Sequence, residues 1–275
     1  MDSSPFKKNN QDRHSKTWLQ SAALYKEPRL LGILFLGFAS GLPFLLTLAT
    51  LHVWLTEVGI TKTVIGLFAL VTLPYSFKFI WAPLIDQFKV PVLGRLLGHR
   101  KGWMIASQLM LILSLILLGQ TSPDQNIIVT ALAALSVSFF SATQDICVEA
   151  YRVERLEHNE VGLGAGASNL GYRLGMWVSG AGALYLASSF SWATVYGFMA
   201  ACMLVGVITA LLSHEPDVER SLENTLTSPQ KKRSVIELFK ALYKGVKRTV
   251  AYLRARDDFA VLLAYIVFFK LADTA

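Results

Sequence analysis

Charged side chains are scarce in this chain: Asp, Glu, Lys and Arg make up only 16% of its 275 residues, whereas 53% are hydrophobic. An ordinary soluble domain carries about 25% charged residues, so the composition argues against one. There are only two cysteines, Cys147 and Cys202, and both lie in apolar runs. Because no pair occurs in a polar loop, the sequence predicts neither a disulfide framework nor a zinc site. Buried thiols that behave as small hydrophobic groups are expected instead.

Enzyme motifs are also lacking. The sequence contains no phosphate-binding loop, zinc-protease motif or nucleophile elbow. Gly162, Gly164 and Gly166 match part of a dinucleotide fingerprint, but they precede an apolar helix and follow no predicted strand. We therefore predict that the chain is not an enzyme and that it holds no metal or cofactor.

Long apolar runs are what the chain has in abundance. A membrane-spanning helix needs roughly 20 apolar residues. The six candidate spans are Leu30–Val53, Val64–Leu84, Gly102–Gln120, Ile127–Cys147, Gly164–Ala187 and Trp192–Leu212. A further run begins near Phe259 and continues to Ala275. We predict an all-α, multi-pass membrane protein with a polar segment at 1–29, six spans within 30–212, a loop at 213–258 and an incomplete seventh span at 259–275.

The net charge of +7 is unevenly distributed. Six Lys or Arg residues precede the first span, four follow the second, two follow the fourth and ten lie between 220 and 256. The loops on the other side hold only Lys62. Because Lys and Arg accumulate in cytoplasmic loops, we predict a cytoplasmic N-terminus, and we interpret the basic excess as a topology signal rather than as nucleic-acid binding.

The second part of the long loop has helical periodicity. Apolar residues recur among lysines and arginines at Val235, Phe239, Leu242, Val246 and Val250. This pattern predicts a basic amphipathic helix on the membrane surface or an ordinary helix that packs on another loop.

A few ionisable residues lie within the predicted spans, where they usually face a polar cavity. Asp145 and Glu149 are four residues apart in SATQDICVEA and share a helix face, with Gln144 beside them. Burial favours the protonated form of a carboxyl group, which suits a proton-coupled carrier. The alternative for both acids is a position near the lipid headgroups, where Asp145 would cap the helix.

Two cations accompany these acids. Arg173, about nine residues into the fifth span, cannot lose its proton, so it needs either an ion pair with Asp145 or an anionic ligand such as a carboxylate or phosphate. Lys78 either joins Arg173 in a cavity or extends to the headgroups. Lys270 and Asp273 would add charges from the seventh span. Small residues also recur at every fourth position of the fifth span, which predicts close helix packing: Ala167, Gly171, Gly175, Ser179 and Ala183.

The loop between the second and third spans has the composition of an inner-face gate. Asp86 ends the second span, and Arg95, Arg100 and Lys101 precede the third. A carboxylate there could pair with these cations in one state and release them in another. The alternative is a set of solvated loop charges that only fix the topology.

Several ordered segments resemble the AmpG-type muropeptide permeases of the major facilitator superfamily. They are FASGLPFLLTLATLHVWL, FKFIWAPLID with GHRKGW, SATQDICVEA, GYRLGMWVSG and FKLAD, and they cover most of Leu30–Leu212 in order and spacing. The resemblance implies the N-terminal six-helix bundle of this fold and the start of a second half. It also implies proton-driven import of anhydromuropeptides across the inner membrane, with Asp145 as a function-critical residue.

The same resemblance implies an anionic sugar-peptide substrate, a lipid bilayer and a second half supplied by a separately encoded chain or a second copy. One departure from the family pattern is that its second acid in the fourth span is Glu149 here. Acetyl-CoA transporters share parts of the pattern, so an anionic solute of that kind is one alternative. A non-transporting paralogue or subunit is the other.

Overall fold

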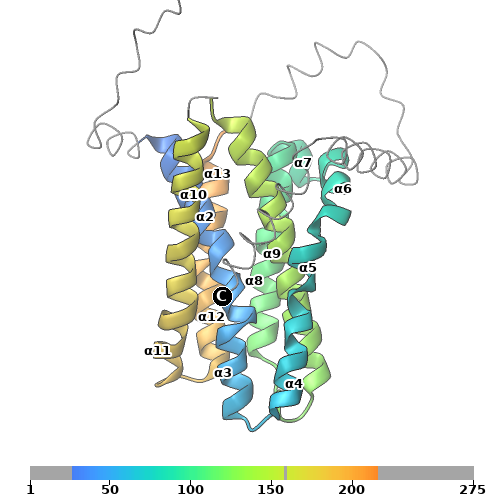
Figure 1. Ribbon diagram of the computed structural model, residues 1–275. Coiled ribbons are helices and arrows are strands. Elements are labelled where there is room, and N and C mark those ends of the chain that lie inside the picture. The colour runs from blue at the N-terminus through green and yellow to red at the C-terminus, as the bar shows by residue number, and fades with distance from the viewer. Residues whose placement is uncertain (1–26, 158–159, 216–275) are drawn as a thin grey trace, which may run out of the picture. The chain divides into compact units, whose positions relative to one another are not determined.

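The computed structural model describes residues 27–157 and 160–215 (Figure 1). All of them belong to the first of the two compact units of the chain, residues 1–219. The described residues form helices and contain no strand, which confirms the all-α expectation. The predicted amphipathic helix, Lys270 and Asp273 lie outside the described residues.

The first span consists of two helices, α2 (Pro28–Thr47) and α3 (Ala49–Glu57). They are separated at Leu48, whose φ of −111° and ψ of −99° are not helical. Pro43 lies inside α2, where proline removes one backbone hydrogen bond and crowds the preceding turn. The Thr47 hydroxyl donates to the carbonyl oxygens of Pro43 and Phe44 at 3.3 and 3.0 Å. The chain therefore breaks its helix one turn after the proline and satisfies some of the freed carbonyls locally.

The second span is segmented. It runs through α4 (Lys62–Leu67), the 3₁₀ helices η1 (Phe68–Thr72) and η2 (Lys78–Ile80), α5 (Leu73–Phe77) and α6 (Ala82–Gln87). Pro74 and Pro83 lie in the first turns of α5 and α6, positions that proline tolerates because those N–H groups have no intrahelical partner. Proline thus starts two of the new segments in this span.

The remaining helical segments differ widely in length. They are α7 (Leu93–Leu96), α8 (His99–Gly119), α9 (Ile127–Arg155), α10 (Val161–Trp177), the π-helical η3 (Val178–Gly182), α11 (Ala183–Ala187), α12 (Trp192–Cys202) and α13 (Leu204–Leu212). Asn126 caps α9 by accepting from the Val129 N–H, and Ser191 caps α12 by accepting from the Thr194 N–H. These caps satisfy N–H groups that the helices leave free.

Five helical stretches are long and apolar enough to cross a membrane: Pro28–Glu57, Lys62–Ile80, His99–Gly119, Ile127–Arg155 and Trp192–Leu212. Each corresponds to one expected span. The fifth expected span, Gly164–Ala187, lies within the helical stretch Val161–Ala187 but is not among these five stretches. Asn169, Arg173 and its glycines make this stretch more polar than the others.

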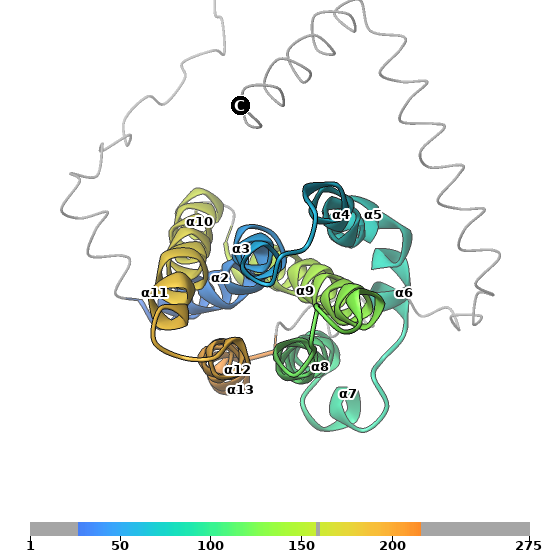
Figure 2. The same cartoon turned by 90° about the horizontal axis from the view of Figure 1, so that it is seen from below.

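Helix α2 lies against α9, α10 and α13, and α8 packs on α9 and α12. Figure 2 shows α2 and α9 between the α10–α11 stretch on one side and α4–α6 on the other. The backbones of α2 and α10 touch: a Cβ atom on Gly37 or Gly41 would contact the carbonyl oxygens of Ser168 and Tyr172. The small residues predicted to pack closely are indeed buried, and the glycines are what lets these two helices approach.

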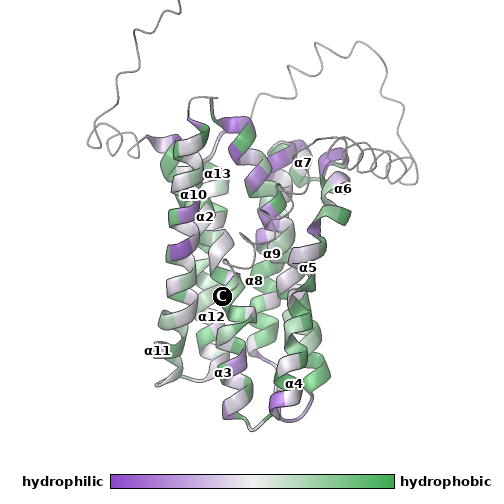
Figure 3. Cartoon of the chain, in the orientation of Figure 1, coloured by the Kyte–Doolittle hydropathy of each residue, from purple (hydrophilic) through white to green (hydrophobic). Residues whose placement is uncertain are grey.

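The buried apolar residues form two main clusters along the bundle. Hydrophilic residues gather at the end that carries α6 and α7 (Figure 3), and we call it the ionic end. The near cluster, on the side of the ionic end, includes Leu36, Met104, Ile105, Ile146 and Cys147. The far cluster, toward the opposite end, includes Leu42, Leu46, Leu111, Leu115 and Val137. The stretch of bundle between them is where the site lies.

Candidate functional site

The ionic end is organised around Arg100, the second residue of α8. Its Nη1 atom lies 2.6 Å from Asp86 Oδ1 on α6, and its Nη2 atom lies 2.6 Å from Glu154 Oε1 on α9. Arg100 Nε also donates to both Glu154 oxygens at 3.0 and 3.1 Å. A guanidinium that forms several charge-assisted hydrogen bonds holds its partners in a fixed geometry. Arg100 therefore ties three spans together.

The start of α8 is held by a third carboxylate. Glu215, which follows α13, accepts from the backbone N–H groups of Arg100 and Lys101 at 2.7 and 3.1 Å. In return, Lys101 Nζ donates to the Leu211 carbonyl near the C-terminus of α13 at 3.1 Å. A carboxylate at a helix N-terminus and a cation at a C-terminus are both favoured by the helix dipole. The two helices thus cap one another.

The predicted gate residues are therefore only partly brought together. Asp86 and Arg100 form an ion pair, whereas Lys101 binds α13 and Arg95 is exposed on α7. Sequence reasoning missed Glu154 and Glu215, because both lie beyond the predicted ends of the fourth and sixth spans. The signal in the sequence that could have identified them is that Glu154 and Glu215 are acidic residues close to the predicted ends of their spans, where the cations of this end also lie.

Lys78 and Glu149 meet partway along the bundle. Lys78 Nζ on η2 lies 3.0 Å from Glu149 Oε1 on α9, and the two side chains are 31% and 59% exposed. Trp81 Nε1 donates to Thr143 Oγ1 at 3.2 Å and adds a second link between the second and fourth spans. Two residues predicted to share a cavity are thus paired with each other.

Asp145 lies one turn before Glu149 on α9. Its Oδ1 atom is buried and has no hydrogen-bond partner among the residues that the structure describes. The charges of Lys78 and Glu149 act on it, and it in turn acts on the hydroxyl groups of Tyr75 and Tyr172. The neighbouring Gln144 is fully buried and its Nε2 atom donates to Ser40 Oγ at 3.4 Å. The buried carboxyl oxygen thus lies among polar groups from several helices.

Arg173 is exposed on α10, on the side away from Gly171 and Gly175, which pack on α2. Within 27–157 and 160–215 it forms no hydrogen bond or ion pair. The ion pair with Asp145 considered from the sequence is therefore not formed in this structure. Arg173 presents its charge outward from the described bundle, at the level of a predicted membrane span.

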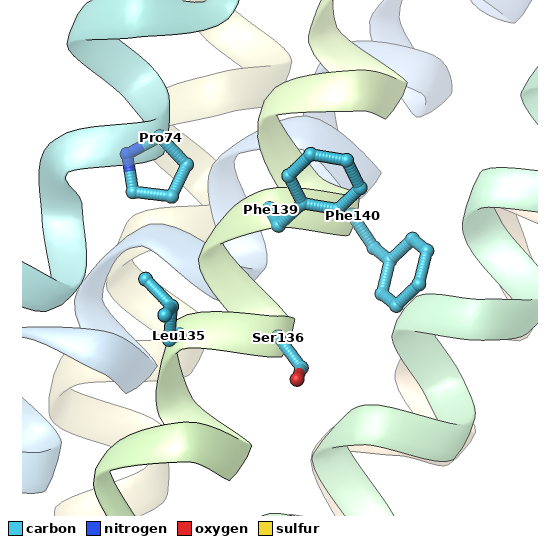
Figure 4. A pocket seen from close by; sticks show the side chains of 5 residues that line it. All are labelled: Pro74, Leu135, Ser136, Phe139 and Phe140. Carbon is cyan, nitrogen blue, oxygen red and sulfur yellow. The ribbon is translucent and has the colours of Figure 1, made fainter.

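The two hollows described in the bundle have different linings. One, of about 370 Å³, lies between α5 and α9 and is formed by Pro74, Leu135, Ser136, Phe139 and Phe140 (Figure 4). None of these lining residues is ionisable, and the Ser136 hydroxyl already donates to the Leu132 carbonyl, so this lining provides no charge for an ionic ligand. The other, of about 300 Å³, is lined by His52, Val53, Thr56 and Glu57.

Comparison with known proteins shows to which protein family the chain belongs. Residues 30–272 match the sequence profile of the Major Facilitator Superfamily. The chain belongs to this superfamily, whose members are built from two six-helix halves. It is thus a multi-pass membrane protein of a transporter family.

Its relatives are AmpG-type permeases, which confirms the resemblance seen in the sequence. "Putative transporter AmpG 3" of Rickettsia prowazekii is 36% identical over 255 residues, which cover 91% of this chain and 58% of that protein. The anhydromuropeptide permease of Escherichia coli K12 is 40% identical over 215 residues, 76% of this chain and 43% of the permease. The chain spans about half the length of these relatives.

Proposed function

We propose that this chain takes part in proton-coupled import of anhydromuropeptides across the inner membrane. The name of the Escherichia coli relative supports the substrate class. The observation that carries the mechanism is the buried Asp145 Oδ1 atom in the middle of a membrane-spanning helix. A carboxyl group in a membrane-spanning helix that no ion pair holds is suited to exchange a proton between two sides of a membrane.

Two cations, one near Asp145 and one exposed on α10, fit a substrate that carries carboxylates. Arg173 exposes a planar guanidinium that binds carboxylate bidentately. Lys78 forms an ion pair with Glu149, and its positive charge also acts on Asp145. It can therefore balance the negative charge that Asp145 gains when it loses its proton. In this proposal Asp145 exchanges the proton, and Arg173 and Lys78 attract the anionic peptide stem.

The proposed orientation places the ionic end in the cytoplasm. Arg100 and Lys101 lie there, as do the C-terminal residues Arg152 and Arg155 of α9, and cations accumulate on that side. The Asp86–Arg100–Glu154 cluster would then close the cytoplasmic end of the bundle in one state and open in another. A second six-helix half completes the path between halves.

The direct test is uptake of radiolabelled anhydromuropeptide into proteoliposomes under an imposed proton gradient, with and without a supplied C-terminal half. We expect Asp145→Asn to lose gradient-driven accumulation by at least about tenfold, because an amide cannot bind and release the proton. Counterflow of substrate without a gradient should persist, since binding does not require the proton exchange.

Glu57→Gln is the matched control, because Glu57 is a carboxylate at the opposite end of the bundle that accepts from Trp192 Nε1. It should leave accumulation unchanged. Full gradient-driven accumulation by Asp145→Asn would remove the coupling role. Accumulation of an acetyl-CoA-like anion in place of muropeptide would instead keep the mechanism and change the substrate.

A further inference from the structure

A layer of buried polar side chains crosses the bundle between the near and far clusters. On α8, Gln108 lies between Ile105 of the near cluster and Leu111 of the far cluster. On α9, the corresponding interval runs from Val137 to Ile146. The members of the polar layer are Ser40, Ser107, Gln108, Ser138, Ser141 and Gln144, and each is at most 6% exposed.

Most of the polar capacity of this layer is unused by the protein. Both side-chain atoms of Gln108, the Gln144 Oε1 atom and the hydroxyls of Ser138 and Ser141 have no hydrogen-bond partner among the described residues. The adjoining Asp145 Oδ1 atom is in the same position. An unsatisfied polar group is costly in a membrane interior. The presence of this many such groups in one layer therefore indicates that a ligand binds them.

Two serines of the layer, Ser138 and Ser141, differ from the other hydroxyl residues of α8 and α9, which include Ser107 of the layer with its bond to the Met104 carbonyl at 2.9 Å. Serine and threonine in a helix commonly donate to a carbonyl one turn earlier, as Ser136 does to Leu132, Thr143 to Phe139 and Ser114 to Met110. Ser138 and Ser141 form no such bond. Their hydroxyls are therefore available for a partner outside their own helix.

Gln108 lies beside small residues of α13 and α2 that offer it no polar side chain. A Cβ atom on Gly206 of α13 would lie 2.9 Å from Gln108 Nε2. The same Cβ atom would lie 2.5 Å from the Cβ atom of Ala39 on α2. Gly206 therefore leaves room for the amide but offers no polar side chain. Ser40, the next residue of α2, binds Gln144, so the two buried glutamines flank α2 at one level of the bundle.

We infer that this layer is a water-binding site enclosed between the two apolar clusters. The ligand must be small, uncharged and able both to donate and to accept, because the orphan atoms include an amide N–H₂ group, amide oxygens and hydroxyls. Buried water makes two to four hydrogen bonds to groups of this kind. The waters would touch Asp145, and if the proposed proton exchange holds, they are its nearest proton-transfer partners; the hydration itself does not depend on that function.

Hydration can be measured on the full chain through the exchange of a thiol proton for deuterium, followed by infrared spectroscopy of the S–H stretch. Ser138→Cys and Ser141→Cys would be made in a background with Cys147→Ala and Cys202→Ala. The control is the native thiol of Cys147, which is buried in the near cluster on the same helix, with only Cys202→Ala introduced.

We expect both introduced thiols to exchange at least about tenfold faster than Cys147, because they contact water without any opening of the bundle. Equal, slow exchange at all three positions would overturn the inference, since the layer would then be dry.

A second measurement keeps the inference testable if the cysteine variants do not fold. Gln108→Met replaces the amide with an apolar side chain of similar length. In a dry layer this change removes unsatisfied atoms and should raise the unfolding temperature, whereas in a hydrated layer it removes hydrogen bonds to water and should lower it. Leu111→Met, one turn further along in the far cluster, controls for the flexibility of methionine. A raised unfolding temperature for Gln108→Met would contradict the inference.

Discussion

The ionic end and the buried polar layer handle polar groups in opposite ways. At the ionic end, Arg100 binds Asp86, Glu154 and, through its backbone, Glu215. In the layer, Gln108 uses neither of its amide atoms. The comparison indicates that the ionic end holds helices together with bonds formed inside the protein, whereas the layer keeps its bonding capacity for something that the helices do not provide.

The two regions also differ in how their polar groups are exposed. Arg100 and Glu154 are 16% and 20% exposed, so their charges retain some access to water at the end of the bundle. The polar layer is closed on both sides by apolar clusters. A charge there would be expensive, which agrees with a layer that consists of amides and hydroxyls, with the one carboxyl group, Asp145, beside it.

The largest effect should come from breaking the centre of the ionic end. Arg100→Met leaves Asp86 and Glu154 without their cation, and removing one partner of a largely buried ion pair costs about 3 kcal/mol of unfolding free energy. The unfolding temperature of the purified chain in detergent measures this loss. Arg95→Met, an exposed cation on the neighbouring α7, should change it little. An equal effect of the two substitutions would mean that the cluster does not hold the spans.

A smaller effect is expected where a single cap is removed. Glu215→Ala deprives the N-terminus of α8 of a carboxylate that accepts two backbone N–H groups, and loss of a cap costs about 1 kcal/mol. Glu215→Gln retains an acceptor oxygen and should fall between the wild type and the alanine variant. If alanine and glutamine behave alike and match the wild type, the contact between α8 and the residue after α13 has no energetic role.

The smallest effect on stability should occur at the half-exposed pair. Lys78→Met removes an ion pair whose partners are 31% and 59% exposed, and such pairs contribute about 0.5 kcal/mol. Gradient-driven uptake should nevertheless fall severalfold, because Lys78 balances the charge of Asp145 in the proposed cycle. Lys62→Met, at the first residue of α4, is the control. Unchanged uptake in Lys78→Met would assign the pair a purely structural role.

Hydropathy predicted the spans well where a helix is uniformly apolar. Trp192–Leu212 has the same bounds in the sequence and in the structure. The fourth span was predicted to end at Cys147, but α9 continues to Arg155. Hydropathy reports where the apolar residues end, whereas a helix continues as long as its backbone bonds are formed. The extra turns carry Glu149 and Glu154, the two acids whose partners the structure reveals.

The pairs themselves could not be read from the sequence. Which cation meets Asp86 depends on how α6, α8 and α9 are positioned against each other, and spacing along the chain does not fix this. Pro74 indicates from the sequence that the second span is bent, but its division into several short helices depends on packing that the sequence does not show. Gln108 was overlooked for a different reason, because a single amide within a long apolar run was treated as an ordinary residue of the span. That polar interruption was the signal of a buried polar site.

The central claim is that the charged groups of the fourth and fifth spans line a water-filled route rather than facing lipid. The direct measurement is the reaction of Arg173→Cys, in the background without native cysteines, with a charged water-soluble thiol reagent in proteoliposomes. Phe198→Cys, at an exposed apolar position of α12, is the control that a lipid-soluble maleimide alone should label. We predict that Arg173→Cys reacts with the charged reagent and is protected by muropeptide. Reaction with the lipid-soluble reagent only, as for Phe198→Cys, would contradict the account.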